Sequence, residues 1–63
     1  MTLWVLVSSL VVDCLVEVGK NHQVIYDGPS TEIPNNIKDL TIREWLLEYD
    51  DILKEYALYT QVY

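Results

Sequence analysis

The sequence predicts a small α+β domain, in which an N-terminal helix or strand packs on a small antiparallel sheet. Residues 11–18 alternate in polarity and precede turn-forming residues, which is typical of a β-hairpin. Residues 55–62 alternate in the same way and predict a closing strand. The 63 residues are short enough that we expect a single domain, 1–63.

The opening segment, residues 2–10, is compatible with either a helix or a strand. Thr2 is a residue type that caps helices, and one helical face follows it at the expected spacing: Leu3, Leu6, Val7 and Leu10. The several valines of residues 5–12 favour a strand instead. Periodicity alone does not decide between the two.

Residues 11–26 are expected to form the β-hairpin. One side of its first strand is apolar, and Asp13 and Glu17 fall on the other side with Val11 and Leu15. Residues 19–22 supply the turn, 23–26 the second strand, and the turn-forming run 27–30 ends the hairpin. The apolar side consists of Val12, Cys14, Val16 and Val18.

The second half of the chain contains one short predicted helix and one more ambiguous segment. Pro34 at a first helical position predicts a helix of one or two turns near 34–40. Residues 41–49 fit a helix that begins with a capping box at Thr41, but a strand is slightly favoured. A turn at Asp50 and Asp51 would then lead into the closing strand near 55–62.

The composition limits the kinds of partner. Ten acidic residues against four basic ones give a net charge of −6, which repels phosphate and anionic lipid. We therefore expect no direct binding of nucleic acid or membranes, and a basic protein surface is the natural complement. The alternative is that the negative charge has no specific partner and only keeps the domain soluble. A chain this small usually needs additional stabilisation, such as a disulfide or a partner subunit. A single cysteine excludes a disulfide within the chain, so the remaining options are a dense core or self-association, for example a homodimer.

The uncharged N-terminus is expected to be part of the core and not a targeting segment. Residues 1–12 carry no charge, whereas a secretory signal begins with basic residues. Asp13 and Glu17 interrupt the apolar run before it reaches the ~20 residues that span a bilayer. The expected location is the cytoplasm, and the single unpaired cysteine agrees with a reducing compartment.

No constellation of residues predicts catalysis, a metal or a cofactor. Cys14 is in phase with buried valines, and His22 lies in the hairpin turn, so neither has an evident catalytic partner. The carboxylates of Asp50 and Asp51 form the only adjacent acidic pair and are better explained as turn formers. The two glycines are too far apart to form a phosphate-binding loop. We expect a protein that is not an enzyme.

The residues most suggestive of function lie in the C-terminal third, where carboxylates are mixed with tyrosines. Carboxylates on a rigid element can occupy a groove whose Lys and Arg side chains normally hold phosphates. Tyrosine is a typical anchor at protein interfaces. The predicted partner-binding residues are Asp39, Glu44, Glu48, Asp50, Asp51, Glu55 and Tyr59.

The order of the motifs resembles small acidic proteins encoded by phages and prophages of Firmicutes. The matching stretches are Met1-Thr2-Leu3, Ile25-Tyr26-Asp27-Gly28, Ile33-Pro34 and Asp39-Leu40 before Ile42. The resemblance implies an opening helix, a hairpin, a short helix and a second strand pair. Such proteins usually open with a charged helix, so the run Leu3-Trp4-Val5-Leu6-Val7 indicates an unusually buried or subunit-covered element.

The resemblance also implies a function. The expected protein is a phage-encoded inhibitor in the cytoplasm of the host cell. The most specific form of this hypothesis is an anti-CRISPR protein that mimics DNA and binds a basic site on a Cas nuclease. The alternative is a small homo-oligomeric structural or accessory phage protein.

Overall fold

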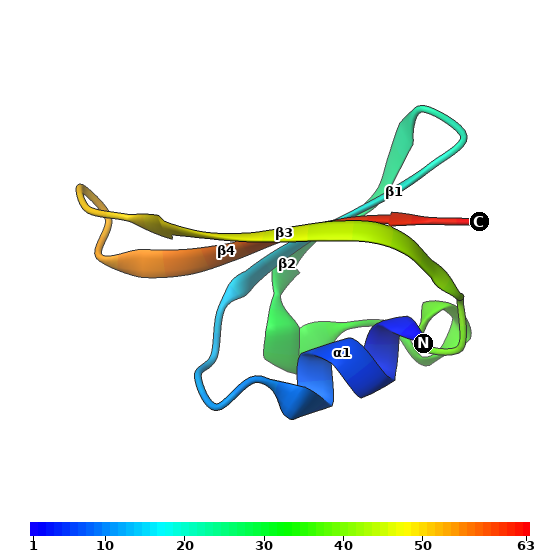
Figure 1. The fold of residues 1–63 in the computed structure, drawn as a ribbon, viewed down its shortest axis with the longest axis horizontal. Helices are drawn as coiled ribbons and strands as arrows, with labels where there is room; N and C mark the ends of the chain where they lie inside the picture. The colour runs from blue at the N-terminus through cyan, green and yellow to red at the C-terminus, as the bar shows by residue number, and fades with distance from the viewer.

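The computed structural model describes residues 1–63 and has one helix on one side of a four-stranded sheet (Figure 1). The order along the chain is α1 (Leu3–Ser9), β1 (Leu15–Lys20), β2 (Gln23–Pro29), the 3₁₀ turns η1 (Ser30–Glu32) and η2 (Asn35–Ile37), β3 (Ile42–Asp50) and β4 (Glu55–Val62). The predicted α+β class is confirmed, as is the closing strand at 55–62.

Helix α1 settles the first ambiguous segment in favour of a helix. The Thr2 hydroxyl accepts a hydrogen bond from the amide of Val5 at 3.3 Å and caps the first turn. Leu3, Leu6 and Val7 are buried against the sheet. The valines therefore do not force a strand here, because the spacing of the leucines lets one helical face be buried.

The β1–β2 hairpin begins later and ends later than predicted. Residues 11–14 precede β1 outside any strand, and Val11 and Val12 are exposed because no strand pairs with them. The run 27–30 was expected to be a turn, but β2 continues to Pro29 because it pairs with Leu15 at the start of β1. The turn itself is only Asn21 and His22, both with positive φ.

In the second half, the favoured strand is confirmed with adjusted bounds, and the predicted helix is shorter than expected. The helix expected near 34–40 is reduced to the single 3₁₀ turn of η2, which follows Pro34 and buries Ile37. The segment 41–49 is a strand, so the capping-box interpretation at Thr41 is wrong. The helical alternative fails because this segment pairs with β4 along its length.

The sheet is mixed rather than wholly antiparallel. Its strand order is β2-β1-β4-β3, and β1 and β4 run parallel, from Leu15 opposite Ala57 to Gly19 opposite Gln61. β4 takes the central position because its inner side is buried at Leu58, Thr60 and Val62, whereas β3 is largely exposed. β3 and β4 run antiparallel in their hairpin. Because β4, and not β3, is the strand beside β1, the pair that joins the two hairpins is parallel.

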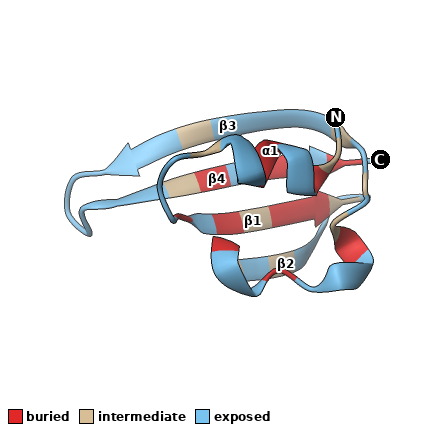
Figure 2. Ribbon diagram, turned by 90° about the horizontal axis from the view of Figure 1, so that it is seen from below, coloured by how far each residue is buried: buried red, intermediate tan, exposed pale blue.

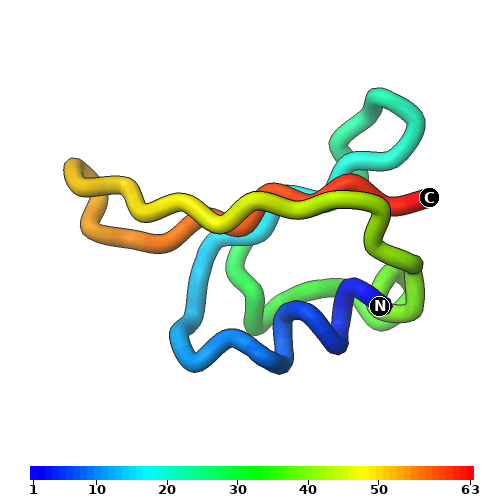
Figure 3. Tube along the Cα trace, viewed as in Figure 1, coloured from blue at the N-terminus to red at the C-terminus, as the bar shows by residue number.

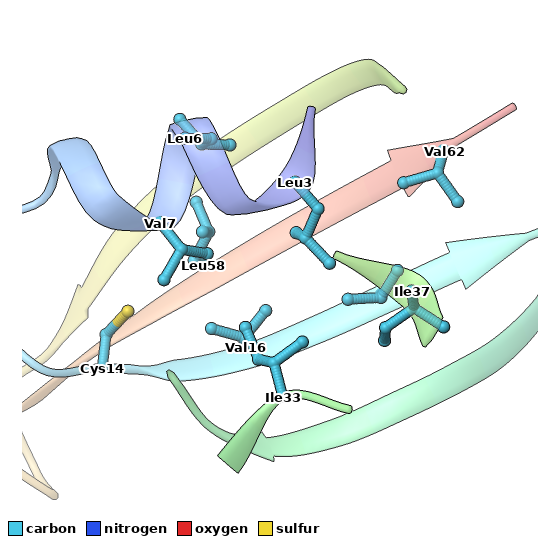
Figure 4. Packing of buried hydrophobic residues seen from close by; sticks show 10 residues of the cluster. Leu3, Leu6, Val7, Cys14, Val16, Ile33, Ile37, Leu58 and Val62 are labelled. Atoms are coloured by element: carbon cyan, nitrogen blue, oxygen red, sulfur yellow. The ribbon is translucent and has the colours of Figure 1, made fainter. Parts of the chain in front are cut away.

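The core lies entirely on one side of the sheet. Figure 2 shows buried residues on β1, β4 and the inner side of α1, and exposed residues along most of β3. Side chains from α1, the loop after it, the segment between the two 3₁₀ turns and η2 meet β1 and β4 there (Figure 4). The cluster comprises Leu3, Leu6, Val7, Cys14, Val16, Val18, Ile33, Ile37, Leu58 and Val62.

Candidate partner-binding face

The side of the sheet opposite α1 is covered by no helix, and we call it the open face (Figure 1). Residues that are directly opposite on paired strands project to the same side of a sheet. The register therefore assigns this face residue by residue. Its central row reads Asp27, Glu17, Tyr59 and Leu46 across β2, β1, β4 and β3.

Two further rows flank the central one. One row consists of Pro29, Leu15, Ala57 and Glu48, and the other of Val24, Gly19, Gln61 and Glu44. Asp50 and Glu55 pair at the outer end of the β3–β4 hairpin. The open face thus gathers six of the ten carboxylates in the chain: Glu17, Asp27, Glu44, Glu48, Asp50 and Glu55.

Tyr59 lies at the centre of this face. Its side chain is 42% exposed, and it lines three shallow hollows of about 190, 200 and 410 Å³. The first is lined in part by Leu15, Glu17 and Asp27, the second by Glu44 and Leu46, and the third by residues at the outer end of the β3–β4 hairpin. Exposed leucines therefore lie beside Tyr59, with carboxylates around them.

The basic residues lie away from the centre of the face. Lys38 lies on the opposite side with its ammonium group 4.2 Å from the centre of the Trp4 ring, and Lys54 is in the β3–β4 turn. Arg43 lies in the bulge at the start of β3, where its guanidinium is 3.7 Å from the Glu44 carboxylate. This exposed pair contributes little stability, so most of the negative charge of the face is unneutralised.

Arg43 also lines the largest hollow, of about 560 Å³, at one end of the open face. Asn21 and His22 of the hairpin turn and Tyr63 contribute to the same hollow. Its lining is mainly polar, unlike the largely apolar pockets that bind small molecules. The hollow therefore marks a polar boundary of the face.

The structure brings together most of the predicted partner-binding residues but not all of them. Glu44, Glu48 and Tyr59 lie on the open face, and Asp50 and Glu55 at its outer end. Asp51 lies in the turn beyond β3 and lines a hollow of about 410 Å³ together with Glu48, Asp50 and Tyr59. Asp39 follows η2, where the neighbouring carbonyls of Lys38 and Leu40 accept hydrogen bonds from α1, so it lies on the covered side.

Sequence reasoning missed Glu17 and Asp27 as members of this face. They join it because Glu17 is opposite Tyr59 on β4 and opposite Asp27 on β2. The alternation of residues 11–18 already placed Glu17 on the polar side of its strand. The alternation could not reveal the parallel pairing of β1 with β4, because this pairing joins residues more than 40 positions apart.

The Asp50 carboxylate has a structural role in addition to its charge. Its Oδ1 atom accepts hydrogen bonds from the amides of Ile52 at 2.9 Å and Leu53 at 3.0 Å. This arrangement closes the β3–β4 turn, as predicted for an aspartate at this position. Asp50 is therefore less available to a partner than Glu44 or Glu48.

Cys14 is buried beside the sheet and does not face the open side. Burial raises the pKa of its thiol, the charge of Asp13 raises it further, and the hydrogen bond with Ser30 partly offsets both effects. The thiol is therefore protonated at neutral pH and weakly nucleophilic. No group of three or more His, Cys, Asp or Glu side chains is arranged to hold a metal ion.

None of the helices has the length and apolar character needed to cross a membrane. Comparisons with protein-family models, curated proteins and solved structures gave no match.

Proposed function

We propose that this protein is a non-catalytic, phage-encoded binding protein whose open face engages a basic nucleic-acid-binding site on a host nuclease. The observation that carries the proposal is the gathering of six carboxylates around Tyr59 and two exposed leucines on one uncovered sheet face. The charges give attraction and orientation, and the apolar centre gives area that can be desolvated.

A basic groove is the favoured complement for physical reasons. Lys and Arg side chains that are arranged to bind phosphates can also bind carboxylates, because both groups are anionic hydrogen-bond acceptors. The face offers them a rigid sheet, so little conformational entropy is lost on binding. The phage origin, the host cytoplasm as location and the choice of a Cas nuclease rest on the resemblance of the short motifs, with an anti-CRISPR inhibitor as the sharpest version.

The experiment is a binding and inhibition assay with a purified Cas nuclease from a Firmicutes host. We expect the protein to reduce DNA binding by the nuclease, and its own affinity to fall steeply as NaCl is raised. The variant Glu44→Lys/Glu48→Lys should lose at least about tenfold in affinity, because attraction becomes repulsion at two positions.

The matched control is Glu32→Lys/Asp39→Lys, which changes the net charge by the same amount on the side of the sheet that α1 covers. This variant should bind almost as well as the parent protein. Absence of binding at low salt would exclude the nuclease tested as the target. Equal losses in the two double variants would show that net charge, and not the face, is responsible.

A second candidate function is homo-oligomerisation through the outer side of α1. Met1, Trp4 and Val5 are about half exposed there, and Val11 is almost fully exposed just after the helix. Residues 1–12 contain no acidic side chain, so two copies can meet there without the repulsion between carboxylates expected for two open faces, and the Lys38 ammonium beside Trp4 is a charge at this surface. An exposed apolar patch of this kind is typical of an interface.

Light scattering tests this alternative. A mass of two or more chains that reverts to one chain in Val5→Glu would support it, because a buried unpaired carboxylate is strongly unfavourable. A single-chain mass at high protein concentration would exclude it. The nuclease assay on the same Val5→Glu variant separates the two functions, since the open face is unchanged.

A further inference from the structure

The outer edge of β3 is an unpaired strand edge. β3 is the last strand of the sheet, and its only neighbour is β4. Its first residue is already covered, because the amide of Ile42 donates to the carbonyl of Met1 at 2.8 Å and Thr2 bridges Thr41. From Glu44 to Asp50 the pairing with β4 is regular, so seven consecutive residues present a free edge.

The opposite edge of the sheet is less suited to pairing. The register of β2 shifts opposite Val18 and Gly19, and the strand ends at Pro29, which has no amide hydrogen. Natural edge strands are usually protected by such features. The edge of β3 has its one bulge at the beginning, beside Arg43, and the β3–β4 hairpin extends beyond α1 (Figure 3).

The two sides of this edge differ in chemistry. On the open face, Glu44 and Glu48 flank Leu46, and the Asp50 carboxylate beyond them already accepts hydrogen bonds from the amides of the turn. On the covered side, Trp45 and Tyr49 are about half exposed, and the Tyr49 ring packs edge-on against Tyr56 with centroids 4.9 Å apart. A strand placed alongside would meet carboxylates on one side and aromatic rings on the other.

A second copy of the chain is a poor occupant of this edge. A two-fold antiparallel pair must keep each side of the sheet continuous, so residues of the same side oppose each other. The register centred on Leu46 sets Glu44 of each copy opposite Glu48 of the other. Centring the pair on Leu47 sets Glu44 opposite Asp50, and centring it on Trp45 requires the end that Met1 and Thr2 cover.

We propose that β3 accepts an added strand from a basic partner, and this inference rests on the proposed function. The added segment carries Lys or Arg at two positions four residues apart, opposite Glu44 and Glu48. It carries an aliphatic residue between them, opposite Leu46, and apolar residues at the alternate positions, over Trp45 and Tyr49. Main-chain hydrogen bonds along Glu44–Asp50 supply affinity, and the lysine spacing supplies register.

The probe is a synthetic nine-residue peptide with two lysines four residues apart and valines or threonines elsewhere. Its control has the same composition with the lysines three residues apart, which places them on opposite sides of a strand. We expect the first peptide to bind at least about tenfold more tightly by titration calorimetry. Glu48→Lys should abolish this preference, and Glu32→Lys, a charge reversal in η1 on the covered side, should retain it.

Backbone methylation separates strand addition from simple charge attraction. In an added strand only alternate amides face the neighbouring strand. Methylating the peptide nitrogens at one alternate set of positions should therefore abolish binding, and methylating the other set should change it less than about threefold. Slower hydrogen exchange confined to amides of β3, and not of β2, should accompany binding.

The outcomes decide the two proposals separately. Equal effects of the two methylated sets, or no preference for the four-residue spacing, would overturn strand addition. The proposed binding to the nuclease would not be affected by that result, because it is tested separately by its salt dependence and by its loss in Glu44→Lys/Glu48→Lys. If the nuclease does not bind but the peptide result is as expected, strand addition holds for a different basic partner.

Discussion

Cys14 shows how a single residue joins two elements through its backbone. Its amide donates to the hydroxyl of Ser30 at 3.3 Å, and its carbonyl accepts from the Ser30 amide at 2.8 Å. These bonds connect the start of β1 to the end of β2. Ser30 is buried, and this pair of bonds satisfies the polar groups that burial would otherwise leave unpaired.

The raised pKa of the Cys14 thiol makes stability depend on alkaline pH. Above the ordinary thiol pKa of 9.0 the unfolded chain loses this proton while the folded chain retains it. The contribution is fully present below that pH and is lost as pH rises through the folded pKa. We expect the free energy of unfolding to fall above about pH 9, and less steeply in Cys14→Val.

Urea unfolding at a series of pH values measures this difference. The pKa of Tyr26 is also raised, by burial first and by Glu32 and Asp27 next, and its effect has the same sign. Tyr26 is present in both proteins, so the difference between their slopes isolates the thiol. Parallel slopes for the two proteins would contradict the expectation.

Among the elements, the β3–β4 hairpin is the one whose turn carries the most specific chemistry. Asp50→Ala removes the acceptor for the amides of Ile52 and Leu53 and should lower the free energy of unfolding by about 1 kcal/mol. Asp50→Asn keeps an oxygen acceptor and should recover most of this loss. Denaturant midpoints of the three proteins measure it.

Asp51→Ala is the matched control for the turn. It removes the same charge one residue away, and no hydrogen bond is recorded for the Asp51 side chain, so its effect should stay within about 0.5 kcal/mol. A loss in Asp51→Ala as large as that in Asp50→Ala would show that the charge at the hairpin tip, and not the turn bonds, determines stability.

For the molecule as a whole, the uneven distribution of charge is the main electrostatic feature. Six carboxylates share one face, and the net charge is −6. Salt shortens the screening length from about 30 Å at 0.01 M to about 10 Å at 0.1 M, which weakens the repulsion between them. We expect the free energy of unfolding to rise as NaCl is raised over this range.

The charge-neutralised pair Glu44→Gln/Glu48→Gln tests where the repulsion arises. Stability should rise less with salt in this variant than in the parent, whereas Glu32→Gln/Asp39→Asn, on the covered side, should resemble the parent more closely. Thermal unfolding at several salt concentrations provides the measurement. If the stability of the parent protein were independent of salt, repulsion between the carboxylates of the open face would not lower its free energy of unfolding.

The sequence by itself determined the α+β class, the closing strand at 55–62 and the turn that follows β3, because these follow from local periodicity and turn chemistry. It also located Glu44, Glu48 and Tyr59 as candidate binding residues. Only the tertiary structure decided that β4 lies parallel to β1, and thereby that Glu17 and Asp27 join this face while Asp39 leaves it. Local patterns specify which side of a strand is polar, whereas strand order depends on which apolar sides can be buried together.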